Sequence, residues 1–196
     1  MAGRFTDKEC EQILLALRQE ARRQACTAGM RKTTVEQLAQ AADISKGAFY
    51  HFYASKEMLF LEVLEAFHEE MYGCAAQALE KYRRLPARDC AAKALLEMCR
   101  MLQDSGMSAF WENDVPILLR RLPKEILETH YHDDEVHIAA LLTPLCAGEE
   151  RRAKLAAATV RGLMLTVTHQ AEIGPLYPQV LETFIRGICK ELFPDR

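Results

Sequence analysis

The stretch TTVEQLAQAADISKGAFYHFYASKEML, residues 33–59, decides the fold because it encodes two very short helices joined by a break. Thr33-x-x-Glu36 has the pattern of a capping box that opens the first helix. Ser45 is a good N-cap for the second helix, which we expect to end near Tyr53. Helices this short are marginal in water on their own. We therefore expect the two to pack on each other and on a third helix.

Helical patterns also fill the rest of the chain. Thr6-x-x-Glu9 predicts a capping box for a helix that stops at Gly29, and Ser55 caps a long helix that runs to about Arg83. No segment alternates between apolar and polar residues as a strand does. Further helices are expected over 87–104, 108–120, 124–129, 133–146, 149–172 and 177–193.

The composition is that of a globular protein, with 196 residues, 49% hydrophobic and 27% charged. No apolar run reaches the ~18 residues that a membrane span needs, and the N-terminus has no apolar signal-peptide core. We therefore expect a cytoplasmic protein with no membrane partner. The seven cysteines form no C-x-x-C pair, so we expect them to be reduced.

Charge is unevenly distributed along the chain, whose formal net charge is −3. Residues 1–56 hold nine basic and six acidic side chains, whereas acidic side chains are in excess in the remainder. A basic head on an acidic body fits a nucleic-acid-binding module that is attached to something else.

The two short helices have the pattern of a helix-turn-helix. Ala39 lies where the helices approach most closely, and Ile44 fills the angle between them. The second helix is then free to enter a DNA major groove, which is wide enough for one α-helix. We predict an all-α fold of about nine helices. An N-terminal three-helix helix-turn-helix DNA-binding domain covers residues 1–54, and a helical domain for ligand binding and dimerisation covers 55–196.

The residues that face outward from the second helix are candidates for DNA contacts. Small side chains at its start let the backbone approach the bases, while hydroxyl, imidazole and ammonium groups donate to base edges or phosphates. Free N–H groups at the start of the first short helix suit another phosphate. The predicted DNA-binding residues are Thr34, Ser45, Lys46, Gly47, Ala48, Tyr50, His51 and Lys56.

Residues 33–64, TTVEQLAQAADISKGAFYHFYASKEMLFLEVL, resemble the DNA-binding domain of the TetR (tetracycline-repressor-like) regulators. Shared features are the Thr-Thr start, Ala-Ala before the turn, Ser-Lys-Gly opening the recognition helix, and Ser-Lys-Glu-x-Leu leading into a long helix. The resemblance covers about residues 10–64. It departs at Asp43, where glycine is frequent, and at Phe52, where His or Tyr is frequent. It also departs at Tyr53 and Ala54, where Phe and Pro are usual. Asp tolerates a left-handed backbone, and the hydroxyl of a tyrosine needs a partner or solvent.

The resemblance implies a role for each contact and a set of partners. Phosphate contacts would come from Thr34, Tyr50 and Lys56, and His51 would contact either phosphates or bases. Lys46, Gly47 and Ala48 would face the bases. The implied protein is a homodimeric repressor that leaves a palindromic double-stranded operator when an unknown small-molecule effector enters the helical domain.

Two sets of residues in the helical domain are candidates for the remaining functions. Apolar stripes on the last two helices would form a four-helix dimer interface, although they would equally complete the chain's own core. The predicted interface residues are Val160, Leu163, Val167, Leu181, Phe184 and Ile188. Residues expected to line an apolar effector pocket, unless they are ordinary core, are Met98, Met101, Met107, Phe110, Trp111, Leu118, Met164 and His169.

A metal centre is the main competing interpretation. Glu65-x-x-His68 and Asp134-x-x-His137 each place a carboxylate one helical turn from an imidazole, which is half of a di-iron pattern. We interpret residues 130–137 instead as a solvated, charged helix start. Nucleophile and nucleotide motifs are absent from the sequence, so we predict no catalytic residue, metal ligand or cofactor. The alternatives are a metal-dependent helical oxidoreductase and a helical ligand-binding protein without DNA recognition.

Overall fold

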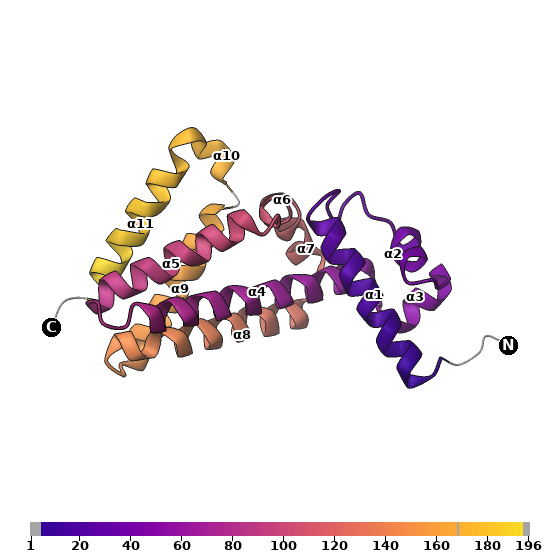
Figure 1. Cartoon of the computed structure of the whole chain (residues 1–196), viewed down its shortest axis with the longest axis horizontal. Helices are drawn as coiled ribbons and strands as arrows, with labels where there is room; N and C mark the ends of the chain where they lie inside the picture. Colours follow the sequence, from indigo (N-terminus) through magenta and orange to yellow (C-terminus); the bar gives the residue numbers. More distant parts are fainter. Residues whose placement is uncertain (1–4, 168, 194–196) are drawn as a thin grey trace. The chain divides into compact units, whose positions relative to one another are not determined.

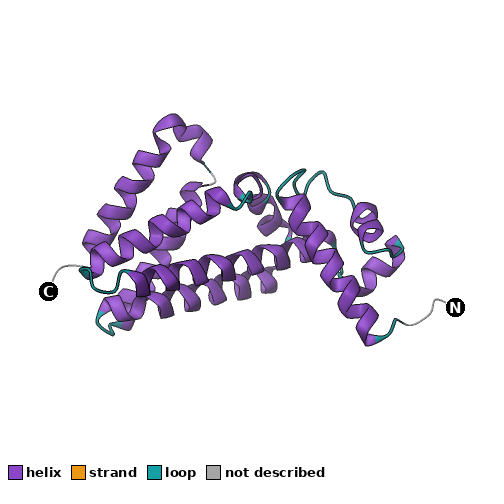
Figure 2. Ribbon diagram, viewed as in Figure 1, coloured by secondary structure: helices purple, strands orange, loops and turns teal. Residues whose placement is uncertain are grey.

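The computed structural model describes residues 5–167 and 169–193, and every regular element in these ranges is a helix (Figure 2). The all-α prediction is confirmed. The helices, labelled in Figure 1, are α1 (Asp7–Ala25), α2 (Val35–Ala41), α3 (Lys46–Phe52), α4 (Lys56–Lys81), α5 (Ala87–Asp104), α6 (Ser108–Asn113), α7 (Val115–Arg121), α8 (Lys124–Leu142), η1 (Thr143–Cys146), α9 (Glu150–Val167), α10 (Gln170–Ile173), η2 (Gly174–Leu176) and α11 (Tyr177–Leu192).

Three expected helix boundaries are wrong. The break expected between 129 and 133 does not exist, because α8 continues from Lys124 to Leu142 and no glycine or proline interrupts that range. The helix expected over 108–120 is instead divided at Asp114 into α6 and α7. The helix expected over 149–172 ends as α9 at Val167.

Side-chain caps explain where the first helices begin. Thr6 and Glu9 form the predicted capping box of α1, and the Ser45 hydroxyl accepts from the Ala48 amide, as expected for α3. The second capping box is shifted by one residue, because it is Thr34 that caps α2, together with Gln37.

The chain divides into two compact units, and the first consists of Met1–Phe67 and Gly106–Leu122. Helices α6 and α7 therefore pack with the N-terminal helices, although the sequence analysis placed them in the second domain. Two aromatic pairs account for this. The Phe60 and Phe110 ring centroids lie 5.9 Å apart, and those of Phe67 and Trp111 lie 6.2 Å apart.

The second unit consists of His68–Ser105 and Pro123–Arg196. Within it, α8 packs mainly on α9, and α11 packs mainly on α5 (Figure 1). All seven cysteines are free thiols, and four of them are buried. No described helix is long and apolar enough to cross a membrane. The two units share α4, which begins in the first and ends in the second.

Candidate nucleic-acid interface

A rigid turn sets the angle between α2 and α3. Leu38, Ala39 and Phe49 are almost completely buried where the two helices meet. Asp43 adopts the left-handed conformation, with φ 54°, which confirms the expectation for this departure from glycine. The Ile44 amide then donates to the Ala39 carbonyl at 3.0 Å. Because the turn is hydrogen-bonded and the inner faces are packed, α3 presents one fixed side to solvent.

The outer side of α3 carries the predicted base-facing and phosphate-facing residues. Lys46, Gly47, Tyr50 and His51 are exposed, and Ala48 is half-buried. An added Cβ at Gly47 would meet only the Ser45 hydroxyl, at 3.8 Å. No contact among the described residues therefore demands glycine at this position, whereas close approach by an external surface would favour a small residue.

Lys46 is paired across the helix-turn-helix with an acidic residue that the sequence analysis did not single out. Its Nζ lies 2.7 Å from Glu36 Oε1, and both side chains are more than half exposed. This hydrogen bond raises the pKa of the Lys46 ammonium and lowers the pKa of the Glu36 carboxyl. Exposed pairs contribute little stability, so Lys46 can exchange Glu36 for a phosphate or base at small cost.

Lys56 is engaged inside the domain rather than free at its surface. Its ammonium donates to the Met30 carbonyl at 2.9 Å and to the Thr33 carbonyl at 2.7 Å. An ammonium has three donors, so one N–H remains for the predicted phosphate contact. These two hydrogen bonds of Lys56 connect the start of α4 to the loop that leads into α2.

Asp114, another residue missed by the sequence analysis, holds the same loop through its amides. Its carboxylate is buried and accepts from the backbone N–H groups of Met30 at 3.2 Å and Arg31 at 3.3 Å. Gly29 lies beside it with φ 82°, and an added Cβ there would lie 2.5 Å from Asp114 Oδ2. The loop that positions Thr34 is therefore held by Lys56 on its carbonyls and by Asp114 on its amides.

The Tyr53 hydroxyl has the partner that its position was expected to require. It donates to the Glu62 carboxylate, which also lies 2.6 Å from the Arg18 guanidinium. Burial and the Glu62 carboxylate raise the pKa of Tyr53 to about 12. This chain of three groups connects α1, the end of α3 and α4 within the first unit.

The residues predicted to line an effector pocket are divided between the two units. Met107, Phe110, Trp111 and Leu118 are buried in the core of the first unit. In the second unit Met98 and Met164 are buried and Met101 is half-buried, while His169 is exposed and lies near Glu172. The pocket stays a prediction.

The predicted dimer residues differ in exposure. Val160, Leu163, Val167 and Leu181 are buried by their own chain, which agrees with the alternative that they complete its core. Ile188 is half-buried and Phe184 is 44% exposed. Two apolar side chains of α9 have a greater exposed fraction than Phe184: Leu155 is 58% exposed and Leu165 is 61% exposed.

The interpretation of residues 130–137 as a solvated helix start is wrong for two of them. The His130 side chain is only 4% exposed and that of Asp134 15%. Both face His68 of α4 within the second unit. His137 is exposed, as predicted, and its Nδ1 lies 2.9 Å from the Asp133 carbonyl.

The first unit contains a helix-turn-helix that is formed by α2 and α3. Residues 17–63 match the family described as bacterial regulatory proteins, tetR family. A curated relative, the HTH-type transcriptional repressor KstR2 of Rhodococcus jostii (strain RHA1), is 38% identical over 69 residues. That match covers 35% of this chain and 30% of the relative.

Solved structures with the same fold extend over nearly the whole chain. The TetR family repressor AlkX from Dietzia sp. strain DQ12-45-1b, implicated in biodegradation of n-alkanes, has a TM-score of 0.63, 17% identity and 97% coverage of both chains. A transcriptional regulator from Rhodococcus sp. Rha1 has a TM-score of 0.54 and 20% identity, covering 93% of this chain and 94% of its own. The chain is therefore similar to the tetR family of regulators over residues 17–63, and it shares its overall fold with the solved TetR family repressor AlkX.

Proposed function

We propose that this protein is a transcriptional repressor that acts in the cytoplasm on double-stranded operator DNA through α2 and α3. The observation that carries the proposal is the outer side of α3, where Lys46, Gly47, Tyr50 and His51 are exposed above the buried Phe49. Such a helix fits a major groove, while the start of α2 and the Tyr50 hydroxyl suit phosphates.

Binding to a palindromic operator needs two copies of this unit. The proposed dimer interface lies on α9 and α11, where Leu155, Leu165 and Phe184 are exposed. Gly162 lies between the two leucines, and an added Cβ there would meet no atom within 4 Å. Large exposed apolar side chains on two long helices favour burial against a second copy, with two helices from each subunit.

Release by a small-molecule effector completes the proposal. A ligand that binds the second unit more tightly in one arrangement than in another shifts the population of DNA-binding dimers. The relatives that match are transcriptional regulators, which favours this function over the alternative of a metal-dependent helical oxidoreductase.

Fluorescence anisotropy with DNA from upstream of the protein's own gene tests the proposal. We expect the affinity to fall steeply as salt rises, because bound phosphates release counterions. Tyr50→Phe should weaken binding to all sequences alike, whereas Lys46→Ala should lower affinity for the operator about 5–100-fold and alter the preference among sites.

Lys124→Ala is the matched control for Lys46→Ala. Lys124 is also an exposed lysine paired with an acid, Glu128, but it belongs to the second unit. The Lys124→Ala substitution removes the same charge as Lys46→Ala and should leave operator affinity within about twofold of the wild-type value. Equal losses in the Lys46 and Lys124 variants, or binding that is independent of salt, would overturn the assignment of α3 as the DNA-reading helix.

A further inference from the structure

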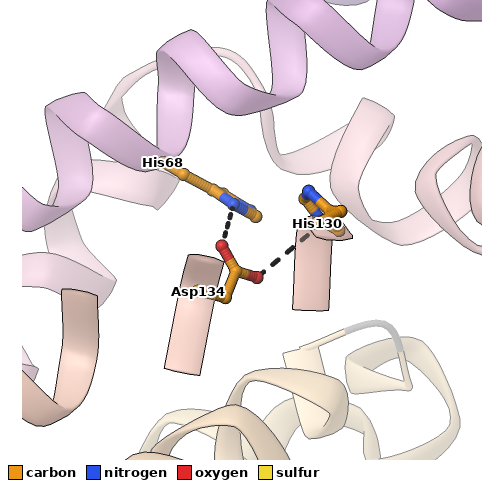
Figure 3. Close-up of side chains that lie close together, drawn as sticks. All are labelled: His68, His130 and Asp134. Atoms are coloured by element: carbon orange, nitrogen blue, oxygen red, sulfur yellow. Dashed lines mark hydrogen bonds and ion pairs between the residues drawn. The ribbon is translucent and has the colours of Figure 1, made fainter. Parts of the chain in front are cut away.

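A cluster of three side chains with metal-binding chemistry lies inside the second unit. His68 comes from α4, while His130 and Asp134 come from α8, and Figure 3 shows all three pointing toward one another. His68 Nδ1 lies 3.0 Å from Asp134 Oδ1, and His130 Nε2 lies 3.7 Å from Asp134 Oδ2. Each oxygen of one carboxylate therefore faces a different imidazole.

The cluster is enclosed by the protein. The side-chain exposure is 12% for His68, 4% for His130 and 15% for Asp134. The two imidazole rings stack, with centroids 5.3 Å apart and 25° between their planes. Polar groups withdrawn from water in this way are costly unless they have partners, and here the groups face one another.

The three donors suit a transition-metal ion in kind and in spacing. Two imidazole nitrogens and one carboxylate oxygen lie within 4.8 Å of one another. Bonds of about 2.0–2.2 Å around a tetrahedral zinc ion place donors roughly 3.3 Å apart. The widest separation must therefore close by about 1.5 Å, which rotation of the imidazole side chains supplies. Because His130 and Asp134 are four residues apart on one helix, both already face α4.

An outer contact holds the carboxylate in place. The Tyr72 hydroxyl donates to Asp134 Oδ1 at 2.6 Å. The Tyr72 ring in turn stacks on His137, with centroids 5.3 Å apart and 12° between the planes. Hydrogen bonds of this kind orient metal-binding carboxylates, and their loss typically weakens metal binding 10–100-fold.

We propose that His68, His130 and Asp134 bind a divalent transition-metal ion and that this ion is the effector that releases the protein from DNA. Zn²⁺, Co²⁺ and Ni²⁺ match a set of two nitrogens and one oxygen, with water in the open position, whereas Mg²⁺ and Ca²⁺ prefer oxygen ligands. The binding site stands on the cluster alone. The role as effector rests on the proposed repressor function.

Helix α4 gives the ion a connection to the DNA-binding unit. The helix that carries His68 also carries Phe60 and Phe67, which make the aromatic pairs of the first unit. A metal ion that bonds His68 to α8 fixes the second half of a helix whose first half belongs to the helix-turn-helix unit. Binding therefore acts on an element that both units share.

Titration of the reduced full-length chain with Co²⁺ tests the site directly. We expect one equivalent to bind and to give visible d–d absorption without the charge-transfer band of a cobalt–thiolate bond, because none of the free cysteines belongs to the cluster. Zn²⁺ should displace Co²⁺, and a large excess of Mg²⁺ should not.

Variants separate the cluster from other histidines. Asp134→Asn and His68→Gln should each weaken Co²⁺ binding at least tenfold, and Tyr72→Phe about tenfold, since it removes only the outer hydrogen bond. His132→Ala is the control, because His132 is an exposed histidine on the same helix. Circular dichroism without metal checks the fold. Should a ligand variant fail to fold, Tyr72→Phe still decides, because it keeps all three ligands.

Each outcome bears on one part of the proposal. Equal Co²⁺ affinity in the wild type and the Asp134→Asn and Tyr72→Phe variants would overturn the site and assign the binding to surface groups. With Zn²⁺ bound, operator affinity of the wild type should fall at least fivefold, but not that of Asp134→Asn. Zn²⁺ binding without that fall would overturn the role as effector. Failure of the metal-free protein to bind DNA would instead overturn the proposed function and leave the site standing.

Discussion

The Asp114→Ala substitution should loosen the loop that leads into α2, because the Asp114 carboxylate accepts from the amides of Met30 and Arg31 at 3.2 and 3.3 Å. A hydrogen bond to a charged acceptor is worth about 1.5–3 kcal/mol. These two are longer than the usual ~2.9 Å, so we take roughly 1–1.5 kcal/mol for each. The Arg31 guanidinium is half exposed and adds little. The variant should therefore lose about 2–3 kcal/mol of unfolding free energy.

Urea unfolding followed by tryptophan fluorescence measures this loss where it occurs. Trp111 is the one tryptophan of the chain and is buried in the same unit as Asp114. Its fluorescence therefore reports the first unit even when the two units unfold separately. With a urea slope near ~2 kcal/mol per molar, the midpoint should fall by roughly 1–1.5 M.

Two further variants test whether the loss of stability comes from the Asp114 carboxylate. Asp114→Asn keeps one carbonyl acceptor and should lose about half as much stability. Asp104→Ala removes an exposed carboxylate from α5 in the second unit and should leave the tryptophan transition within about 0.2 M of the wild type. If Asp114→Ala shifted the midpoint no more than Asp104→Ala, the loop would not depend on this carboxylate and the reasoning would be refuted.

Three other predictions follow from single contacts. Burial and Glu62 raise the pKa of Tyr53 from ~10 to about 12. The hydrogen bond of Tyr53 therefore stabilises the fold fully below pH ~10 and is lost as pH rises to ~12. In urea melts, the stability advantage of the wild type over Tyr53→Phe should shrink by about 2–3 kcal/mol across that range, and a constant difference would contradict this prediction. Glu36→Gln frees Lys46 and should strengthen operator binding several-fold (about 0.5–1 kcal/mol) at low salt only, measured by anisotropy; no gain would show that the pair is not broken on DNA. Leu165→Asp, at a position 61% exposed, should convert dimers into folded monomers in light scattering, and an unchanged dimer would exclude this face of α9.

The local features of the first unit could be predicted from the sequence because each depends on a few neighbouring residues. The Ser45 cap, the left-handed Asp43 and the outward face of α3 all follow from short-range chemistry. The second capping box was predicted at Thr33 but forms at Thr34, because two threonines stand in succession and contacts outside this segment bury the first of them. The Thr33 hydroxyl donates to the Gly29 carbonyl at 2.8 Å.

The interactions that escaped prediction join residues far apart in the chain. Asp114 reaches a loop more than 80 residues earlier, and His68 meets Asp134 across 66 residues. In the sequence, Asp134 belongs to an acidic run that has the composition of a solvated face, and no local pattern marks the one carboxylate that turns inward. The spacing of His130 and Asp134, four residues apart, was the available signal.

The two buried carboxylates Asp114 and Asp134 point to different roles because their partners differ. Asp114 is held by backbone amides and a guanidinium, groups that neither bind metal ions nor change their charge in the physiological range. Asp134 is held by two imidazoles and a phenol, which suit metal binding and its outer hydrogen bonds. Asp114→Asn should therefore lower stability equally with and without Zn²⁺. Asp134→Asn should chiefly abolish the stabilisation that Zn²⁺ gives the wild type, which reaches about 2.7 kcal/mol when free metal is 100 times its Kd.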